Sequence, residues 1–154
     1  MRIVLDTNIL ARAAARTPGP ARELLLRCLD SPHVLLLSEF LLAEVTRALQ
    51  YPRMRKVHGL GDEDIADYVN YLKTASVTVL LPEGTSPAVV RADTEDDPIV
   101  ATAVVGLANV LCSRDHHLYQ PQVVAYCRAR GVEVMNDLDL LNWLRKGGEG
   151  AEIA

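Results

Sequence analysis

The stretch Met1-Arg2-Ile3-Val4-Leu5-Asp6-Thr7-Asn8-Ile9-Leu10 decides the fold of this chain. Its uninterrupted apolar run at positions 3–5 is typical of a short strand that is buried on both faces of a sheet. The run stops at Asp6, and the two residues that follow favour turns and helix starts. Because open α/β sheets bind ligands at the carboxyl ends of their central strands, Asp6 is a candidate functional residue. The alternative is that Asp6 only caps the next helix.

Apolar runs and helical periodicities alternate along the rest of the chain. Further strands are expected at 34–37, 77–81, 110–112 and 132–135. Helices are expected at 9–16, 21–29, 39–50, 62–74, 98–108, 121–130 and 137–144, with a short one at 87–92. This order predicts an α/β protein, a three-layer α/β/α domain over residues 1–146 with a central, mostly parallel sheet of about five strands. The Gly-rich segment 147–154 is expected to be a disordered C-terminal tail.

Composition narrows the class of protein. The chain has 154 residues, 49% of them hydrophobic, and a formal net charge of -4, which does not indicate a surface for indiscriminate nucleic-acid binding. The three cysteines show no paired metal-binding spacing and predict a reducing compartment. No signal peptide and no segment that would span a bilayer are evident, so we expect a cytoplasmic protein that does not enter a membrane.

Two further acidic residues are placed to meet Asp6. Asp115 also follows a short apolar strand, so two aspartates would converge if the two strands are neighbours; the alternative is an ordinary turn aspartate. Glu44 shares its predicted helix face with apolar residues such as Leu41 and Ala48. A buried carboxylate needs a partner, which would be an arginine, a hydrogen-bond network or a metal ion.

The acidic run at 93–97 lies just before a predicted helix that opens with Pro98. Asp97 is the natural N-cap of that helix, which leaves Asp96 freer to reach a cation, and Asp93 could join it. By itself, the run is better explained as a solvated acidic loop with one capping residue.

Taken together, these carboxylates suit a hard cation such as Mg²⁺ or Mn²⁺, which prefers oxygen ligands. Such an ion lowers the pKa of a bound water and stabilises charge on a phosphoryl oxygen. The sequence contains no GxSxG, P-loop or GxGxxG motif that would provide another chemistry. Metal-assisted hydrolysis is therefore the hypothesis that the residues favour.

Several motifs in this order resemble a PIN domain, and more narrowly the VapC-like and related PIN-family toxin nucleases of type II toxin–antitoxin systems. They are VLDTN at 4–8, SEFLLAE at 38–44, Asp93-x-x-Asp96 followed by IVATA at 99–103, and Ser113-Arg114-Asp115. The resemblance implies a metal-dependent endoribonuclease that cleaves single-stranded RNA and leaves a 3′-hydroxyl and a 5′-phosphate. It implies a PIN-like fold, one or two Mg²⁺ or Mn²⁺ ions, a small antitoxin protein as partner, and a homodimer.

The same resemblance assigns roles to individual residues. The catalytic and metal-binding carboxylates would be those of Asp6, Glu44, Asp96 and Asp115. Asn8 and Ser113 would be supporting polar residues. The chain has Asp96-Asp97-Pro98 where the family often has a single acidic residue, so Asp96 and Asp97 could exchange roles, and Asp93 is a further candidate ligand.

Positive charge near the acidic site would bind RNA phosphates. The candidates are Arg53, Arg55 and Lys56, in a basic run after the helix of Glu44, and Arg114 beside Asp115. The basic run is equally consistent with a solvated loop. Arg12 and Arg16 are more simply explained as surface charges, although they could face a substrate.

Three other functions remain as alternatives. A stand-alone RNA-processing PIN nuclease would use the same chemistry without an antitoxin. A non-catalytic PIN-like module would bind RNA or protein. A phosphatase of the haloacid-dehalogenase type also begins with an aspartate after a buried strand, but it needs a second aspartate where this chain has Asn8.

Overall fold

The computed structural model describes residues 1–82 and 97–147 and contains a five-stranded sheet in which every strand pair is parallel. The strands are β1 (Arg2–Leu5), β2 (Val34–Leu37), β3 (Val77–Thr78), β4 (Val110–Cys112) and β5 (Glu133–Met135). Their spatial order is β3-β2-β1-β4-β5, so the first strand is the central one. The predicted α/β/α class and the parallel sheet are confirmed.

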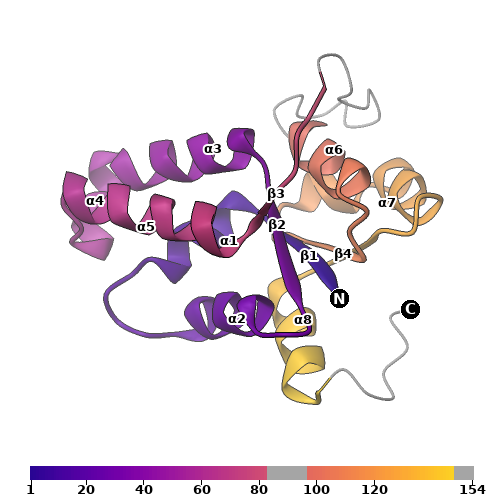
Figure 1. Cartoon of the computed structure of the whole chain (residues 1–154), viewed down its shortest axis with the longest axis horizontal. Coiled ribbons are helices and arrows are strands. Elements are labelled where there is room, and N and C mark those ends of the chain that lie inside the picture. The colour runs from indigo at the N-terminus through magenta and orange to yellow at the C-terminus, as the bar shows by residue number, and fades with distance from the viewer. Residues whose placement is uncertain (83–96, 148–154) are drawn as a thin grey trace.

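Helices connect the strands and lie on both sides of the sheet. They are α1 (Thr7–Ala13), α2 (Pro20–Leu29), α3 (Glu39–Gln50), α4 (Pro52–His58), α5 (Asp62–Ala75), α6 (Asp97–Val105), α7 (Pro121–Arg128) and α8 (Asp137–Arg145). In Figure 1, α6 and α7 lie to the right of the sheet, and α1, α3, α4 and α5 lie to its left. Within the described ranges, none of these helices is long and apolar enough to cross a membrane.

The core is built from the apolar runs that the sequence marks. Ile3, Val4 and Leu5 are completely buried, and so are Leu36 and Leu37 on the neighbouring strand. Strands covered on both faces bury every side chain, which is why these runs do not alternate with polar residues. The free cysteines are buried among them.

The sheet places a switch in chain direction beside Asp6. The chain runs outward from β1 through β2 to β3, and then returns to form β4 and β5 on the other side of β1. β1 and β4 are direct neighbours, with Leu5 opposite Cys112, and the backbone N–H of Asp6 donates to the Cys112 carbonyl at 2.9 Å. At such a switch point the loops leave in opposite directions, which opens a crevice at the carboxyl edge.

Two segments form helices that the sequence did not predict. The basic run at 53–56 lies in a helix, α4, and not in a loop, because Pro52 at its first turn favours helix initiation and Gly59 ends it with φ 68°. Residues 116–119 form a short 3-10 helix, capped by Asp115. The expected helix at 87–92 and nearly all of the expected tail at 147–154 lie outside the described residues.

Candidate active site

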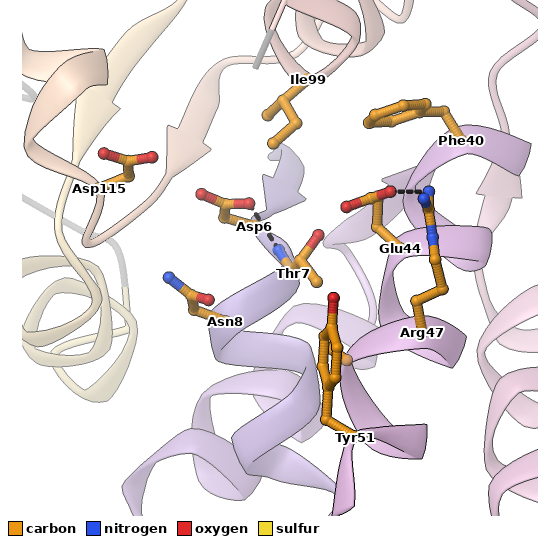
Figure 2. A pocket seen from close by; sticks show the side chains of 10 residues that line it. Asp6, Thr7, Asn8, Phe40, Glu44, Arg47, Tyr51, Ile99 and Asp115 are labelled. Atoms are coloured by element: carbon orange, nitrogen blue, oxygen red, sulfur yellow. Dashed lines mark hydrogen bonds and ion pairs between the residues drawn. The ribbon is translucent and has the colours of Figure 1, made fainter. Parts of the chain in front are cut away.

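A cavity of about 320 Å³ opens at the carboxyl edge of the sheet, and three of the predicted carboxylates line it. Asp6 comes from the end of β1, Asp115 from the segment after β4, and Glu44 from the middle of α3. Figure 2 shows Asp6 between the other two, with Asn8 below it. The fold therefore brings together residues that are far apart in the sequence.

Asp6 is the most deeply buried of the three, with 4% of its surface exposed. Its Oδ1 accepts a hydrogen bond from the Thr7 backbone N–H at 2.6 Å, and its Oδ2 accepts one from the Ser113 hydroxyl at 2.6 Å. Asp6 is thus also the N-cap of α1, as the capping interpretation predicts. Burial raises the pKa of Asp6; the two hydrogen bonds lower it, and the neighbouring Asp115 charge raises it further.

Ser113 links the two aspartates. It is completely buried, its hydroxyl donates to Asp6, and its oxygen accepts the backbone N–H of Asp115 at 2.9 Å. The carboxylate of Asp115 in turn accepts the backbone N–H of His117 at 3.0 Å. One hydroxyl thus holds the carboxylate of Asp6 and the backbone of Asp115, which follow two adjacent strands.

The prediction that Glu44 belongs to the buried face of its helix is wrong. Its side chain is 27% exposed, and it forms an ion pair with Arg47, one turn further along α3. The buried residues of α3 are Leu41, Leu42, Val45 and Leu49. Glu44 lies at the edge of this buried face and is not part of it. Of the partners considered for this carboxylate, an arginine is present, and this arginine, Arg47, belongs to the same helix.

Glu44 instead lies on a second stripe of the helix, which faces the cavity. Phe40, Glu44, Arg47 and Tyr51 follow one another at spacings of three or four residues, Ala48 lies four residues after Glu44, and all five line the cavity. None of Phe40, Arg47 and Tyr51 is among the site residues predicted from the sequence. This spacing was the signal that would have identified them.

The fourth predicted carboxylate is that of Asp96, with Asp97 and Asp93 as the alternatives. Asp93 and Asp96 lie outside the described residues, and only the backbone of Asp97 is described, as the first residue of α6. Ile99, in the first turn of α6, lines the cavity, so this helix begins close to the other carboxylates.

The donor set has the chemistry of a site for a hard cation, although it is not preassembled. The three cavity carboxylates present only oxygen, the ligand that Mg²⁺ and Mn²⁺ prefer. Among residues 1–82 and 97–147, however, no three acidic, histidine or cysteine side chains are grouped closely enough to hold an ion. Glu44 is engaged by Arg47 and would have to turn from it toward Asp6 to join a shared ligand.

The predicted RNA-contacting residues occupy two different places. Arg114 lies next to the cavity, where its Nε is 3.7 Å from the carboxylate of Asp137. Arg55 forms an ion pair with Asp62. Arg53 lines a separate apolar depression beside Tyr51, and none of Arg53, Arg55 and Lys56 is among the described residues that line the acidic cavity.

Comparison with known proteins agrees with this architecture. The structure resembles the crystal structure of FitAcB from Neisseria gonorrhoeae with a TM-score of 0.52 and 19% sequence identity, covering 88% of this chain and 98% of that one. At this identity the likeness supports the fold alone. No curated protein sequence gives a significant match. A family model described as PIN domain matches residues 2–117, well over half of the 154 residues and a span that includes all the predicted acidic positions. The chain therefore belongs to the PIN-domain family.

Proposed function

We propose that this protein is a metal-dependent endoribonuclease that cleaves single-stranded RNA and acts as the toxin of a toxin–antitoxin pair. The observation that supports it best is the convergence of Asp6, Glu44 and Asp115, from three separate elements, on one cavity at the switch point of a PIN-domain sheet. The motifs that these residues belong to are those that resemble the toxin nucleases.

The electrostatics of the cavity favour a bound cation. Asp6 is buried with a raised pKa, and the charge of Asp115 contributes to that rise. A cation between the two carboxylates would reverse both effects, because it stabilises the ionised forms. A bound Mg²⁺ or Mn²⁺ would supply positive charge beside the scissile phosphate and acidify a water molecule.

The chain's own residues would orient this site. The Ser113 hydroxyl and the Thr7 N–H each occupy one oxygen of Asp6, which fixes the plane of the carboxylate and leaves further lone pairs for a ligand. Arg47 holds Glu44 at the edge of the cavity. Phe40 and Ile99 form an apolar wall on one side, which would limit access of water to the reacting phosphate.

The resemblance adds ligands that the geometry does not include. Asp96 is proposed as the fourth carboxylate, with Asp97 and Asp93 as alternatives, because the start of α6 adjoins the cavity. Asn8 lines the cavity and is proposed as a supporting polar residue. A small antitoxin, a homodimer and a cytoplasmic location complete the proposal.

Cleavage of an end-labelled single-stranded RNA by purified protein tests the nuclease. We expect cutting with Mg²⁺ or Mn²⁺ and none with EDTA, and we expect Asp6→Asn and Asp115→Asn to abolish it. Asp62→Asn, an exposed aspartate of the Arg55 ion pair, is the matched control and should cut normally. Cutting that persists in EDTA, or in Asp6→Asn, would contradict the proposal and point to a contaminating ribonuclease.

The ends of the products give a second criterion. Attack by water leaves a 5′-phosphate and a 3′-hydroxyl, and it does not need the 2′-hydroxyl of the substrate. A substrate with one 2′-deoxynucleotide at the cleavage site should therefore still be cut. A 2′,3′-cyclic phosphate among the products would exclude this mechanism.

Expression in cells tests the toxin role separately. Induction of the wild-type chain should arrest growth, whereas Asp6→Asn at the same protein level should not. Active nuclease in the test tube without growth arrest would favour a stand-alone RNA-processing enzyme. Specific RNA binding without any cleavage would favour the non-catalytic module.

A further inference from the structure

A second, larger cavity continues directly from the acidic one and has the opposite charge. Its volume is about 670 Å³, and it shares the side chains of Asn8, Ala48 and Tyr51 with the acidic cavity. Arg12, Met54 and Arg114 line it but not the acidic cavity. We call it the arginine groove, after Arg12 and Arg114.

The two arginines come from distant parts of the chain and meet at one carboxylate. Arg12 Nη2 lies 3.1 Å from Asp137 Oδ2, and Arg114 Nε lies 3.7 Å from Asp137 Oδ1. Arg12 belongs to α1, Arg114 follows β4, and Asp137 is the first residue of α8. One carboxylate between two guanidinium groups leaves a net positive charge and holds both arginines at the same edge.

The guanidinium groups remain available to a ligand. The side chains of Arg12 and Arg114 are 41% and 53% exposed, whereas that of Asp137 is 27% exposed. A guanidinium has five N–H donors, and a single carboxylate engages at most a few of them. The free donors suit a second oxyanion, and phosphate is the one that arginine binds in nucleic acids.

Tyr51 stands on the boundary between the two cavities. It is 63% exposed and lies in extended backbone between α3 and α4, with φ -60° and ψ 132°. Pro52 disfavours a helical conformation at Tyr51, which helps to keep the ring outside either helix. In Figure 2 the ring rises from below toward the space between Thr7 and Glu44. An exposed aromatic ring beside a phosphate site is the usual platform for an unpaired base.

We infer that the arginine groove binds the nucleotide next to the scissile phosphodiester, with its phosphate held by Arg12 and Arg114 and its base against Tyr51. The inference rests on the proposed function, since it names how that substrate is held. An acidic cavity attracts the RNA backbone only through its cation, so most of the affinity for RNA must come from positive charge nearby. The groove provides that charge beside the cavity, whereas Arg55 is not among the described residues that line either cavity.

Binding of a fluorescently labelled RNA decamer in EDTA, followed by anisotropy over a range of salt concentrations, tests the inference without cleavage. For Arg12→Gln/Arg114→Gln we expect about tenfold weaker binding and a slope of log K against log salt that is shallower by about 0.7 for each phosphate no longer neutralised. The matched control is Arg130→Gln/Lys146→Gln, which makes the same charge change at exposed residues beyond α7 and α8. The control should keep the wild-type slope.

Tyr51 is tested by two substitutions. Tyr51→Leu should weaken binding on the order of tenfold through loss of stacking, and Tyr51→Phe should retain it. With Mg²⁺ present, the groove variants should raise KM and leave kcat nearly unchanged, because they remove binding that is common to substrate and transition state. Thermal unfolding should stay close to wild type, since exposed ion pairs contribute little to stability.

The outcomes separate this inference from the nuclease itself. If the groove variants bind RNA with wild-type affinity and slope, the groove is not the nucleotide site, whether or not the protein cuts RNA. If the control loses as much as the groove variants, the effect is one of net charge and the inference is overturned. Groove-dependent binding without cleavage in Mg²⁺ would support the groove and refute the proposed catalysis.

Discussion

Asp6→Asn should make the metal-free protein more stable while it abolishes activity. Asp6 is 4% exposed, and its pKa in the folded protein is raised because burial outweighs the hydrogen bonds from Ser113 and Thr7. A raised pKa means that the ionised form destabilises the fold relative to the unfolded chain. Asparagine removes that charge, and it remains a good N-cap for α1.

The sign of the pH dependence follows from the same shift. The ordinary pKa of Asp6 is 3.8, and the folded protein holds its proton to higher pH. The wild type therefore loses stability as the pH rises from about that value through the raised pKa, while Asp6→Asn does not. The stability difference should be absent in acid and should grow as the pH rises through the raised pKa.

Its size can be bounded from measured substitutions of this kind. Single stabilising substitutions commonly gain roughly 1 kcal/mol. In a chain of this length, that corresponds to an increase in Tm of about 2–4 °C. The gain is modest because the amide has a single acceptor oxygen, which can keep the bond from Thr7 N–H but leaves no second acceptor for the Ser113 hydroxyl.

The assay is thermal unfolding of both proteins at neutral pH and near pH 4, first in EDTA and then with Mg²⁺. In EDTA we expect the higher Tm for Asp6→Asn at neutral pH only. Mg²⁺ at about 100 times its Kd should stabilise the wild type by about 2.7 kcal/mol and the variant much less. A lower Tm for Asp6→Asn in EDTA would refute the burial argument, and equal stabilisation by Mg²⁺ would refute Asp6 as a ligand.

Three further substitutions test other parts of the structure. Gly106→Ala places a methyl group 2.8 Å from a backbone carbonyl oxygen and from a valine methyl, so it should destabilise by about 1–3 kcal/mol in urea unfolding. Gly19→Ala, with open space around it, is the control. Ser113→Ala removes the hydroxyl that donates to the Asp6 carboxylate and accepts the Asp115 backbone N–H, and it should cost about 1–3 kcal/mol and most of the activity. Glu23→Gln should lower stability at neutral pH, because Arg145 and a second arginine lower the pKa of Glu23 to about 2. That loss should shrink as the pH falls from 4.5 toward 2, and a constant difference across this range would contradict the assignment.

The sequence predicted the fold class and most of the elements because its signals are local. Apolar runs of three or four residues mark β1, β2 and β4, and helical periodicity marks α3 and α5. Boundaries were less accurate. The strand expected at 77–81 pairs only over Val77–Thr78, since pairing depends on how far the neighbouring strand β2 extends. Helix α4 was not predicted, because its run of charged residues was interpreted without the helix-start signal of Pro52 and the helix-end signal of Gly59.

Glu44 shows where an argument from one helix fails. Glu44 lies three residues after Leu41 and four before Ala48. Because an α-helix has 3.6 residues per turn, these spacings are compatible with the buried face and also with the edge of that face. The packing of α3 on α1 and α5 decides between them. That packing leaves Glu44 half-buried at the cavity, where Arg47 reaches it.

What the sequence alone determined is the set of candidate groups: carboxylates at the ends of β1 and β4, a carboxylate on α3, and the acidic run before α6. These follow from residue type and local periodicity, which need no knowledge of the fold. Only the tertiary structure decided that Asp6 and Asp115 are neighbours, that Ser113 joins them, and that Arg12 and Arg114 meet at Asp137. Those relationships depend on the strand order β3-β2-β1-β4-β5, and strand order is a matter of long-range packing that no local pattern encodes.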